Sequence, residues 1–358
     1  MSIFKGNKIS VEIFGSSHAE KIGVICKGFP SMQIDFENLN NVMQKRRPSK
    51  NAFSTQRKET DSVTFTNGVD KGFTNGNWTA EIQNVDRKSG DYNNIYAKPR
   101  PSHADYSSYL KTSNLNFTGG GKFSGRMTAP LCIAGAIAMQ YLSTLGVKIY
   151  SYLSQVGSVK GKSYKDGVDE KELENIKFSI EGGFPSLTKS QEMQTEIENA
   201  QKCGDSVGGI CECVALNVPT GIGDAIFDGV EGKIANILYS IPAVKGVEFG
   251  SGFDLSNMLG SNANDELYFD GDKVKTFTNN SGGINGGITN GMPLTLRVAF
   301  KPTPSIYKTQ KTVDLINKEN VKIQINGRHD SCVAVRGVVV VQCAVAVALL
   351  DLILSEEK

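Results

Sequence analysis

Two long apolar stretches constrain the fold of this 358-residue chain more than any other feature of its sequence. The first, from Thr128 to Leu145, is apolar on nearly every side of a helical turn, which predicts a helix buried on most of its surface. The second, from Val338 to Leu354, approaches the length of a membrane span, but Gln342 and Asp351 interrupt it. We therefore expect two core helices and no membrane-spanning segment.

Charge and composition limit the classes of partner. The chain has 39 Lys and Arg against 37 Asp and Glu, a net charge of +2, which argues against a nucleic-acid-binding protein with an extended basic face. Its 39% hydrophobic and 21% charged residues are typical of a globular protein. No Pro- or Ser-rich linker marks a boundary, so we predict one domain over residues 1–358.

Local patterns predict an α+β chain with antiparallel sheets. Alternating residues in ISVEIFG and GVICKGFP indicate two early strands, and residues 61–84 indicate hairpins that turn at Asn-Gly pairs. Three further helices are expected over Phe36–Arg46, ended by Pro48, over Ser190–Cys203 and over Glu231–Ser240. Gly23–Phe36 and Gly209–Phe227 share a strand, a proline turn and an Ile-x-Phe before a helix, which suggests an internal repeat with halves near 1–150 and 205–358.

The cysteines indicate a reducing compartment and no metal. Seven are scattered through the chain without C-x-x-C spacing, so neither a zinc site nor a redox pair is expected. Cys211 and Cys213 fall two apart in an expected strand, and hence on one of its faces. The N-terminal residues lack the apolar run of a signal peptide. Free thiols without an export signal predict a cytoplasmic protein.

Three histidines, all in segments rich in Gly, Ser, Arg or Asp, are the main candidates for chemistry: His18, His103 and His329. Any one of them alone is better interpreted as a hydrogen-bonded loop residue. Together they favour proton transfer, because imidazole titrates near neutral pH. Few carboxylates accompany them, which argues against a metal site.

Glycine clusters and cations suggest an anionic ligand. Glycines are concentrated in residues 117–126, 205–209 and 281–291, which fits either tight turns or close approach of a phosphate or a flat ring. None forms a P-loop or a Rossmann fingerprint. Basic residues cluster over Lys45–Lys50 and recur in residues 301–306 and 327–336, either as a solvated helix end or as a clamp for a polyanion.

At the level of whole blocks, the chain resembles the chorismate synthase family. The matching blocks run in order from FGSSHAEKIGV to GRHDSCVAVRGVVVVQC, and between them lie KRRPS, TQRKETD, RPSHADYS, GGGKFSGRMTA, GDSVGG, SIPAVKGVEFGSGF, NNSGGINGGITNGMPL and KPTPSI. They cover essentially the whole chain and are far more specific together than any single motif.

The resemblance implies a fold and a reaction. The fold would be a layer of helices between antiparallel β-sheets, assembled as a homotetramer whose interfaces help to shape the active sites. The reaction would convert 5-enolpyruvylshikimate 3-phosphate to chorismate and phosphate by a 1,4-elimination that requires reduced FMN. Whether NADPH serves as the reductant is left open by the sequence.

The resemblance also implies roles for residues. His18 would protonate the departing phosphate, and His103 would steady the reduced flavin near N1. Asp330, aided by Ser17 and Ser124, would take part in proton transfer at flavin N5, while His329 would be structural. The expected substrate contacts are Arg46, Arg126 and Arg336. The expected flavin contacts are Lys122, Phe123, Ser124, Pro242, Ala243, Gly286, Lys301, Pro302, Thr303, Pro304, Ser305 and Arg328.

Three departures from the family pattern remove or change a cation. Ala52 and Thr118 replace arginines, and Lys122 replaces a third. Each lost charge-assisted contact would weaken anion binding by about 1.5–3 kcal/mol. The proton-transfer residues are retained, so we predict an active enzyme with weakened flavin or substrate affinity. The alternative is a degenerate homologue that binds flavin or a polyanion without turnover.

Overall fold

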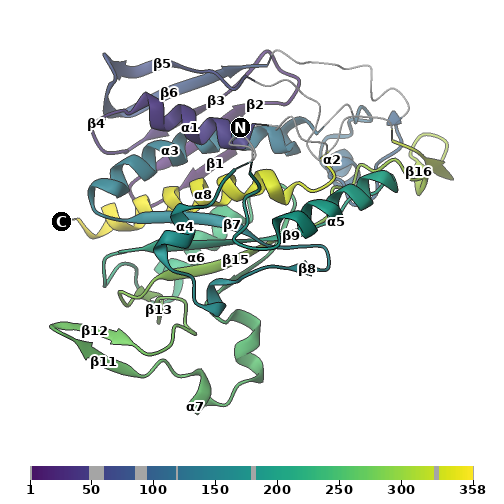
Figure 1. Cartoon of the computed structure of the whole chain (residues 1–358). Coiled ribbons are helices and arrows are strands. Elements are labelled where there is room, and N and C mark those ends of the chain that lie inside the picture. Colours follow the sequence, from purple (N-terminus) through teal and green to yellow (C-terminus); the bar gives the residue numbers. More distant parts are fainter. Residues whose placement is uncertain are drawn as a thin grey trace.

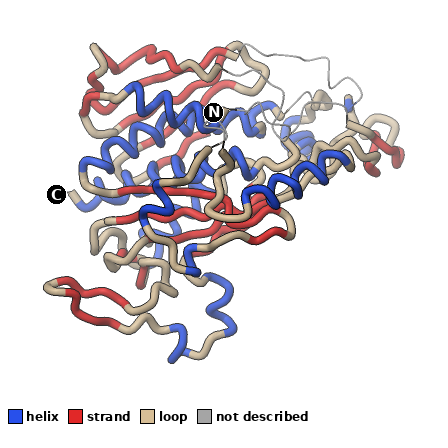
Figure 2. Tube along the Cα trace, in the orientation of Figure 1, coloured by secondary structure: helices blue, strands red, loops and turns tan. Residues whose placement is uncertain are grey.

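The computed structural model consists of three layers, with helices between two antiparallel sheets (Figures 1 and 2). This confirms the predicted α+β class. The structure describes residues 2–47, 60–84, 95–117, 120–178, 183–325 and 330–357.

The first sheet contains six strands, and β5 lies off its main path and pairs with β6. Its strands, in the order β1-β2-β3-β6-β4 followed by β5, are Ser2–Lys5, Ser10–Gly15, Lys21–Lys27, Phe73–Gln83, Met32–Gln33 and Val63–Asp70. The expected early strands and the expected hairpin are present. The prediction that Asn-Gly pairs form the turn was wrong, because the chain turns at Lys71 and Gly72. The Asn67–Gly68 pair instead lies where the register of β5 against β6 shifts.

The second sheet contains five strands in the order β10-β15-β9-β7-β8. In that order they span Val244–Phe249, Leu294–Phe300, Gly209–Leu216, Lys148–Val156 and Val159–Lys160. Three two-stranded sheets complete the described strands: β11–β12 (Leu267–Asp270, Lys273–Thr276), β13–β14 (Ile284–Asn285, Ile288–Thr289) and β16–β17 (Gln310–Asp314, Glu319–Ile323).

Both faces of β9 are buried. Cys211 and Cys213 share its core face, as predicted. Glu212 on the opposite face is also fully buried, and its carboxylate accepts hydrogen bonds from the Tyr152 hydroxyl (2.7 Å), the Ser163 hydroxyl (2.8 Å) and the Tyr164 backbone (2.8 Å). These bonds satisfy a charge that would otherwise be costly to bury.

The helices of the middle layer are α1 (Phe36–Arg46), α3 (Thr128–Thr144), α6 (Val230–Leu238) and α8 (Ala334–Glu356). Elsewhere lie α2 (Asp105–Thr112), α4 (Glu170–Glu174), α5 (Ser190–Lys202) and α7 (Gly260–Ala263). The helices expected around residues 36, 128, 190, 231 and 338 are therefore all present. Pro48, the expected stop of α1, lies outside the described residues.

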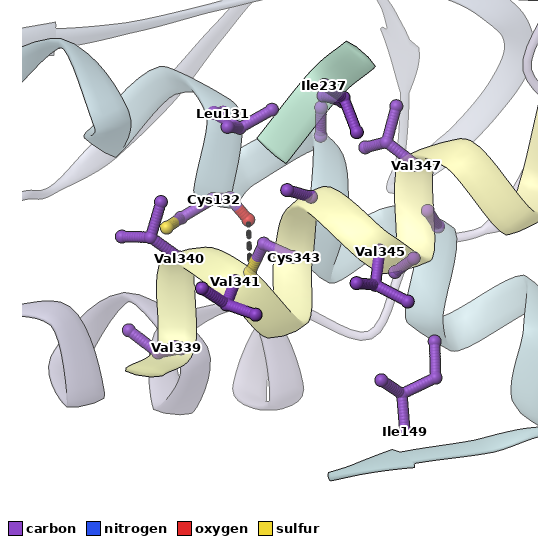
Figure 3. Close-up of a cluster of buried hydrophobic side chains, with 14 of the residues drawn as sticks. Leu131, Cys132, Ile149, Ile237, Val339, Val340, Val341, Cys343, Val345 and Val347 are labelled. Atoms are coloured by element: carbon purple, nitrogen blue, oxygen red, sulfur yellow. Dashed lines mark hydrogen bonds between the residues drawn. The ribbon is translucent and has the colours of Figure 1, made fainter. Parts of the chain in front are cut away.

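The two apolar helices α3 and α8 pack against each other at the centre of the molecule. A Cβ added at Gly135 of α3 would lie 2.2 Å from the Cβ of Cys343 in α8, so the helices approach as closely as a glycine allows. Figure 3 shows the Cys343 thiol directed at the Cys132 carbonyl (3.8 Å), with Ile237 of α6 and Ile149 of β7 beside α8. Among the described residues, α8 has the length and hydropathy to cross a membrane, but 89% of its apolar window is buried inside the protein. It is a core helix, as predicted.

The two large sheets and their helices repeat one connectivity. In the first half β2 pairs with β3, β3 with β6 and β6 with β5; in the second, β7 pairs with β9, β9 with β15 and β15 with β10. Helices α1 and α3 follow β3 and β6, as α6 and α8 follow β9 and β15. This correspondence supports our proposal of an internal repeat within one domain.

Candidate active site

A cavity of about 720 Å³ lies where α3 and α8 begin and α1 ends. Its described lining includes one carboxylate, that of Asp330, and the imidazole of His103. The lining also includes seven cationic side chains: Arg46, Arg100, Lys122, Arg126, Lys245, Lys301 and Arg336. Both α3 and α8 begin at the cavity, so the positive ends of their helix dipoles lie near it. The electrostatics favour an anionic ligand with several charged groups.

A buried carboxylate connects two of the arginines. Asp61 is 0% exposed, and its Oδ2 accepts a hydrogen bond from Arg46 Nη1 at 2.9 Å while its Oδ1 accepts one from Arg126 Nη1. Burial by itself would raise the pKa of Asp61, but the charges of Arg46 and Arg126 hold that pKa below its ordinary value. Asp61 also has a left-handed φ of 46°, a conformation that Asp tolerates better than most residues. It therefore stays ionised and fixes both guanidinium groups.

Hydrogen bonds to the start of α3 and to the preceding residues fix the Arg46 guanidinium. Its Nε donates to Thr128 Oγ1 at 3.2 Å and its Nη2 to the Gly125 carbonyl at 3.1 Å. Arg46 is only 1% exposed although it lines the cavity. It joins the end of α1 to the start of α3 and thereby supports the cavity wall.

Asn84 links Arg126 to the loop that carries His18. The Asn84 side-chain oxygen accepts from Arg126 Nε at 3.0 Å, and its amide group donates to the carbonyls of Ser16 (3.2 Å) and Ala19 (2.9 Å). The Ser17 backbone N–H donates to the Gly121 carbonyl at 3.2 Å. His18 and Ser17 do not line the cavity in this structure, but their loop is hydrogen-bonded to the glycine-rich segment that does.

His103 belongs to a buried ion-pair network with Arg100 and Asp105. His103 Nδ1 lies 2.5 Å from Asp105 Oδ1, and Arg100 donates from Nε (2.7 Å) and Nη2 (2.8 Å) to the two oxygens of the same carboxylate. Burial opposes the charge on Asp105, but the hydrogen bonds from Arg100 and His103 lower its pKa to about 2. For His103, burial is the main cause of a pKa below 6.5, assisted by Arg100 and Lys301 and opposed by Asp105.

Two further segments contribute to the cavity wall. Lys301 donates to the Ser102 carbonyl, and burial together with the nearby Lys245 lowers its pKa. The Ser305 hydroxyl accepts from Arg100 Nη1 at 3.3 Å.

On the glycine-rich segment, the Lys122 ammonium lies 5.1 Å from the Phe123 ring centroid. Ser124 Oγ accepts from the Arg126 backbone at 3.2 Å.

Asp330 and Arg336 form an ion pair at the start of α8. Arg336 Nη1 donates to Asp330 Oδ2 at 3.0 Å, and its Nε donates to the Arg46 carbonyl at 3.1 Å. The end of α1 and the beginning of α8 are therefore connected at the cavity by the Arg336 side chain.

The structure brings most of the predicted site residues to one place. Those that line the cavity are His103, Asp330, Arg46, Lys122, Phe123, Ser124, Arg126, Pro242, Ala243, Lys301, Thr303, Pro304, Ser305 and Arg336. Pro302 does not line it, although both of its neighbours do. Gly286 lies in the turn between β13 and β14, on another part of the molecule (Figure 1). Arg328 and His329 lie outside the described residues, as do Ala52 and Thr118.

Five residues that the sequence interpretation did not single out belong to this site: Asp61, Asn84, Arg100, Asp105 and Lys245. Arg100 and Asp105 flank His103 in RPSHADYS, and Asp61 is the last residue of TQRKETD. These three could have been found from the sequence as polar residues within the blocks that match the family. Among the described residues, no group of three His, Cys, Asp or Glu side chains is placed to hold a metal ion.

Comparisons with known proteins agree with the residue blocks. A family model described as chorismate synthase matches residues 9–354. A chorismate synthase of Korarchaeum cryptofilum is 43% identical over 356 residues, which cover 99% of this chain and 98% of the relative. The Thermococcus kodakarensis chorismate synthase is 43% identical over 353 residues, with 97% and 96% coverage.

A solved structure shows the same fold. A crystal structure of chorismate synthase superposes with a TM-score of 0.76 at 25% identity, and it covers 98% of this chain and 93% of that one. Fold, sequence and a polycationic cavity therefore agree. The chain belongs to the chorismate synthase family, the lyases that form chorismate in the shikimate pathway of aromatic amino-acid biosynthesis.

Proposed function

We propose that this chain converts 5-enolpyruvylshikimate 3-phosphate to chorismate and phosphate by a 1,4-elimination, with reduced FMN bound in the 720 Å³ cavity. The observation that carries the proposal is the convergence of seven cations and two helix N-termini on one cavity. The substrate has two carboxylates and a phosphate, and such a ligand needs this density of positive charge to leave water.

The wall of the cavity fits a flavin. A volume of about 720 Å³ lies in the ordinary range for a ligand of this size. Gly120 lets the glycine-rich segment pack closely at the wall, since a Cβ there would lie 2.8 Å from Ser124. Phe123, Pro242 and Ala243 offer apolar surface, while Lys301 offers a cation for the phosphate group. Reduced FMN, when bound, supplies the electron-rich ring that this redox-neutral elimination requires.

The residues of the chain would bind the substrate and move its protons. A C–O bond to phosphate and a C–H bond break, a ring double bond forms, and phosphate leaves with the C–O electron pair. Arg126 and Arg336, fixed by Asp61 and Asp330, would orient the anionic groups. Asp330, with Ser17 and Ser124, would take part in transfer of the proton lost from the ring. His103 would steady the reduced flavin.

His18 would supply a proton to the departing phosphate. Because His18 does not line the described cavity, this role requires the loop of residues 15–20 to bring its ring toward the ligand. The loop contacts the cavity wall through Ser17 and Asn84, so a small displacement of that wall on binding would move the histidine as well.

Release of phosphate tests the proposal. The purified protein is mixed in air-free buffer with 5-enolpyruvylshikimate 3-phosphate and chemically reduced FMN, and both phosphate and the absorbance of chorismate are followed. We expect equimolar formation of both products, far faster than by the His103→Ala variant. Flavin binding without product above that variant would instead support the degenerate binding homologue. Replacing the chemical reductant with NADPH, and watching whether the flavin bleaches, decides whether the chain reduces its own cofactor.

We also propose that the chain assembles as a homotetramer. Large apolar side chains are exposed around β11–β12, the preceding turns and the segment before α6: Ile226, Phe227, Phe253, Leu259, Leu267, Phe269 and Phe277. The strands β11 and β12 project from the rest of the chain at the lower left of Figure 1, and exposed apolar side chains on such a segment are typical of an interface. Light scattering coupled to size exclusion measures the assembly, and a monomer at micromolar concentration would contradict it.

Cytoplasmic location is proposed from the cysteines. All seven are free, and six of them are buried. Free thiols persist in a reducing compartment. Cell fractionation against a periplasmic or secreted marker tests this location.

A further inference from the structure

Asp105 lies directly behind the one histidine that lines the cavity among the described residues. Its carboxylate is 5% exposed, does not line the cavity and contacts both His103 and Arg100. The sequence interpretation gave it no role. Its contacts determine which nitrogen of His103 carries a proton.

We propose that Asp105 is a positioning residue that keeps the proton of neutral His103 on Nδ1, so that the bare Nε2 is the nitrogen presented to the ligand in the cavity. The inference deepens the proposed function, because it assigns the atom through which His103 would act on flavin or substrate.

The geometry between the two side chains requires a proton. Nδ1 and Asp105 Oδ1 are 2.5 Å apart, and two lone pairs at that separation would repel each other. The hydrogen bonds from Arg100 and His103 lower the pKa of Asp105 to about 2, so its carboxylate is an acceptor near neutral pH. The shared proton therefore belongs to the imidazole, and it lies on Nδ1.

Arg100 makes Asp105 decisive for this choice. Arg100 Nη2 lies 2.8 Å from Asp105 Oδ1 and also 3.1 Å from His103 Nδ1. A guanidinium only donates hydrogen bonds, so without Asp105 it would favour a bare Nδ1 and drive the proton to Nε2. Removing the carboxylate should therefore move the proton of His103 from Nδ1 to Nε2.

The same contacts direct any further proton to Nε2. The charged groups that face His103 are Arg100, Asp105 and Lys301; burial and the two cations keep its pKa below 6.5, although Asp105 opposes them. The free protein therefore holds His103 neutral at pH 7. An anionic ligand would add negative charge beside the ring and favour proton uptake, and Nε2 is the nitrogen left to accept it.

Imidazole ¹⁵N NMR tests the proposal on the free protein. The chain contains three histidines, so a histidine-labelled sample gives three rings, and His103→Gln assigns one of them by its loss. At pH 7.5 we expect the His103 Nδ1 signal at the position of a protonated nitrogen and the Nε2 signal at that of a bare one. In Asp105→Ala the two signals should exchange, and Asp105→Glu should restore the original pattern at least in part.

The matched control is Asp254→Ala, which removes an exposed carboxylate paired with Lys165 and should leave the His103 signals unchanged. A His103 ring protonated on Nε2 in the unsubstituted protein would overturn the proposal, as would an unchanged tautomer in a folded Asp105→Ala variant. Because the first of these outcomes needs no Asp105 variant, the test decides even if Asp105→Ala does not fold.

Kinetics with reduced FMN provide a second readout. We expect kcat of Asp105→Ala to fall by about 10²-fold, within the range for loss of a correctly protonated acid or base. In a His103→Ala background the same change should have little further effect, since Asp105 acts through that ring. Additive losses in the double variant would contradict this. If the chain proves not to turn over substrate, the proposed function fails while the NMR result still stands or falls by itself.

Discussion

Arg46 and Arg126, which are 80 residues apart in the sequence, share the two carboxylate oxygens of the buried Asp61. Removing Asp61 would leave both guanidinium groups buried without this counter-charge. We expect Asp61→Ala to lower the free energy of unfolding by about 3–5 kcal/mol, the usual cost of breaking a buried ion pair. Urea unfolding of the flavin-free protein measures the change.

An exposed pair is the appropriate comparison for Asp61. The Asp254 side chain is 60% exposed and bonds to Lys165 at 2.7 Å, so Asp254→Ala should cost less than about 1 kcal/mol. If Asp61→Ala were equally mild, the network would not be holding the arginines, and the cavity wall would need another explanation.

Acid should destabilise the protein through titratable groups that line the cavity or lie next to its lining. His103, Asp105 and Asp61 all have a folded pKa below the ordinary value, so the unfolded chain binds more protons than the folded one as the pH falls. Their contribution is fully present above the ordinary pKa of each group. It is lost below pH 6.5 for His103, and below 3.8 down to about 2 for Asp105.

Urea midpoints measured between pH 8 and pH 3 test this dependence. We expect a decline that begins below pH 6.5 and steepens below pH 4. Asp105→Asn should flatten the lower part of the curve, since the variant has no carboxylate to protonate there. A stability that increases toward pH 4 would show that groups other than these dominate.

The helices could be predicted from sequence because apolar periodicity is a local property. The predicted bounds of α1, Phe36–Arg46, agree with the structure, and both core helices were recognised from their apolar composition. The hairpin turn was misplaced because Asn-Gly pairs favour positive φ, which a bulge can use as well as a turn. Gly68 has a φ of +75° inside β5.

The candidate site was only partly predictable. His103 was singled out because an imidazole suggests proton transfer, and Arg46, Arg126 and Arg336 because of the family resemblance, whereas Arg100 was missed. Asp61 and Asn84 could not be assigned, because each acts by contacting Arg126 from a segment distant in sequence, and no local pattern reports that contact. The predicted loss of affinity from Ala52 and Thr118 stays a prediction, since both lie outside the described residues.

The close contact of α3 and α8 predicts a sharp difference between two glycines. Gly135→Ala would place a methyl group 2.2 Å from the Cys343 Cβ, and we expect it to cost about 1–3 kcal/mol as the helices are forced apart. Gly232 in α6 has no atom within 4 Å of an added Cβ. Gly232→Ala should therefore stabilise the protein by about 0.5–1 kcal/mol through helix propensity. Thermal unfolding of the two variants compares them, and equal effects would mean that α3 and α8 are not in close contact.

Lys301 should contribute to flavin affinity through its charge at the cavity wall. Its ammonium donates to the Ser102 carbonyl beside His103, and burial keeps its pKa below the ordinary value. Loss of one charge-assisted contact to the FMN phosphate would cost about 1.5–3 kcal/mol, so Lys301→Ala should raise the Kd for FMN by roughly 10- to 100-fold. Lys308, which is exposed and paired with Asp205, provides the matched control, and Lys308→Ala should leave the Kd within about twofold. Fluorescence titration with FMN and with riboflavin distinguishes the phosphate contact from a ring contact. If Lys301 binds the phosphate, riboflavin affinity should be unaffected by the substitution, whereas an equal loss for both ligands would assign Lys301 to the ring.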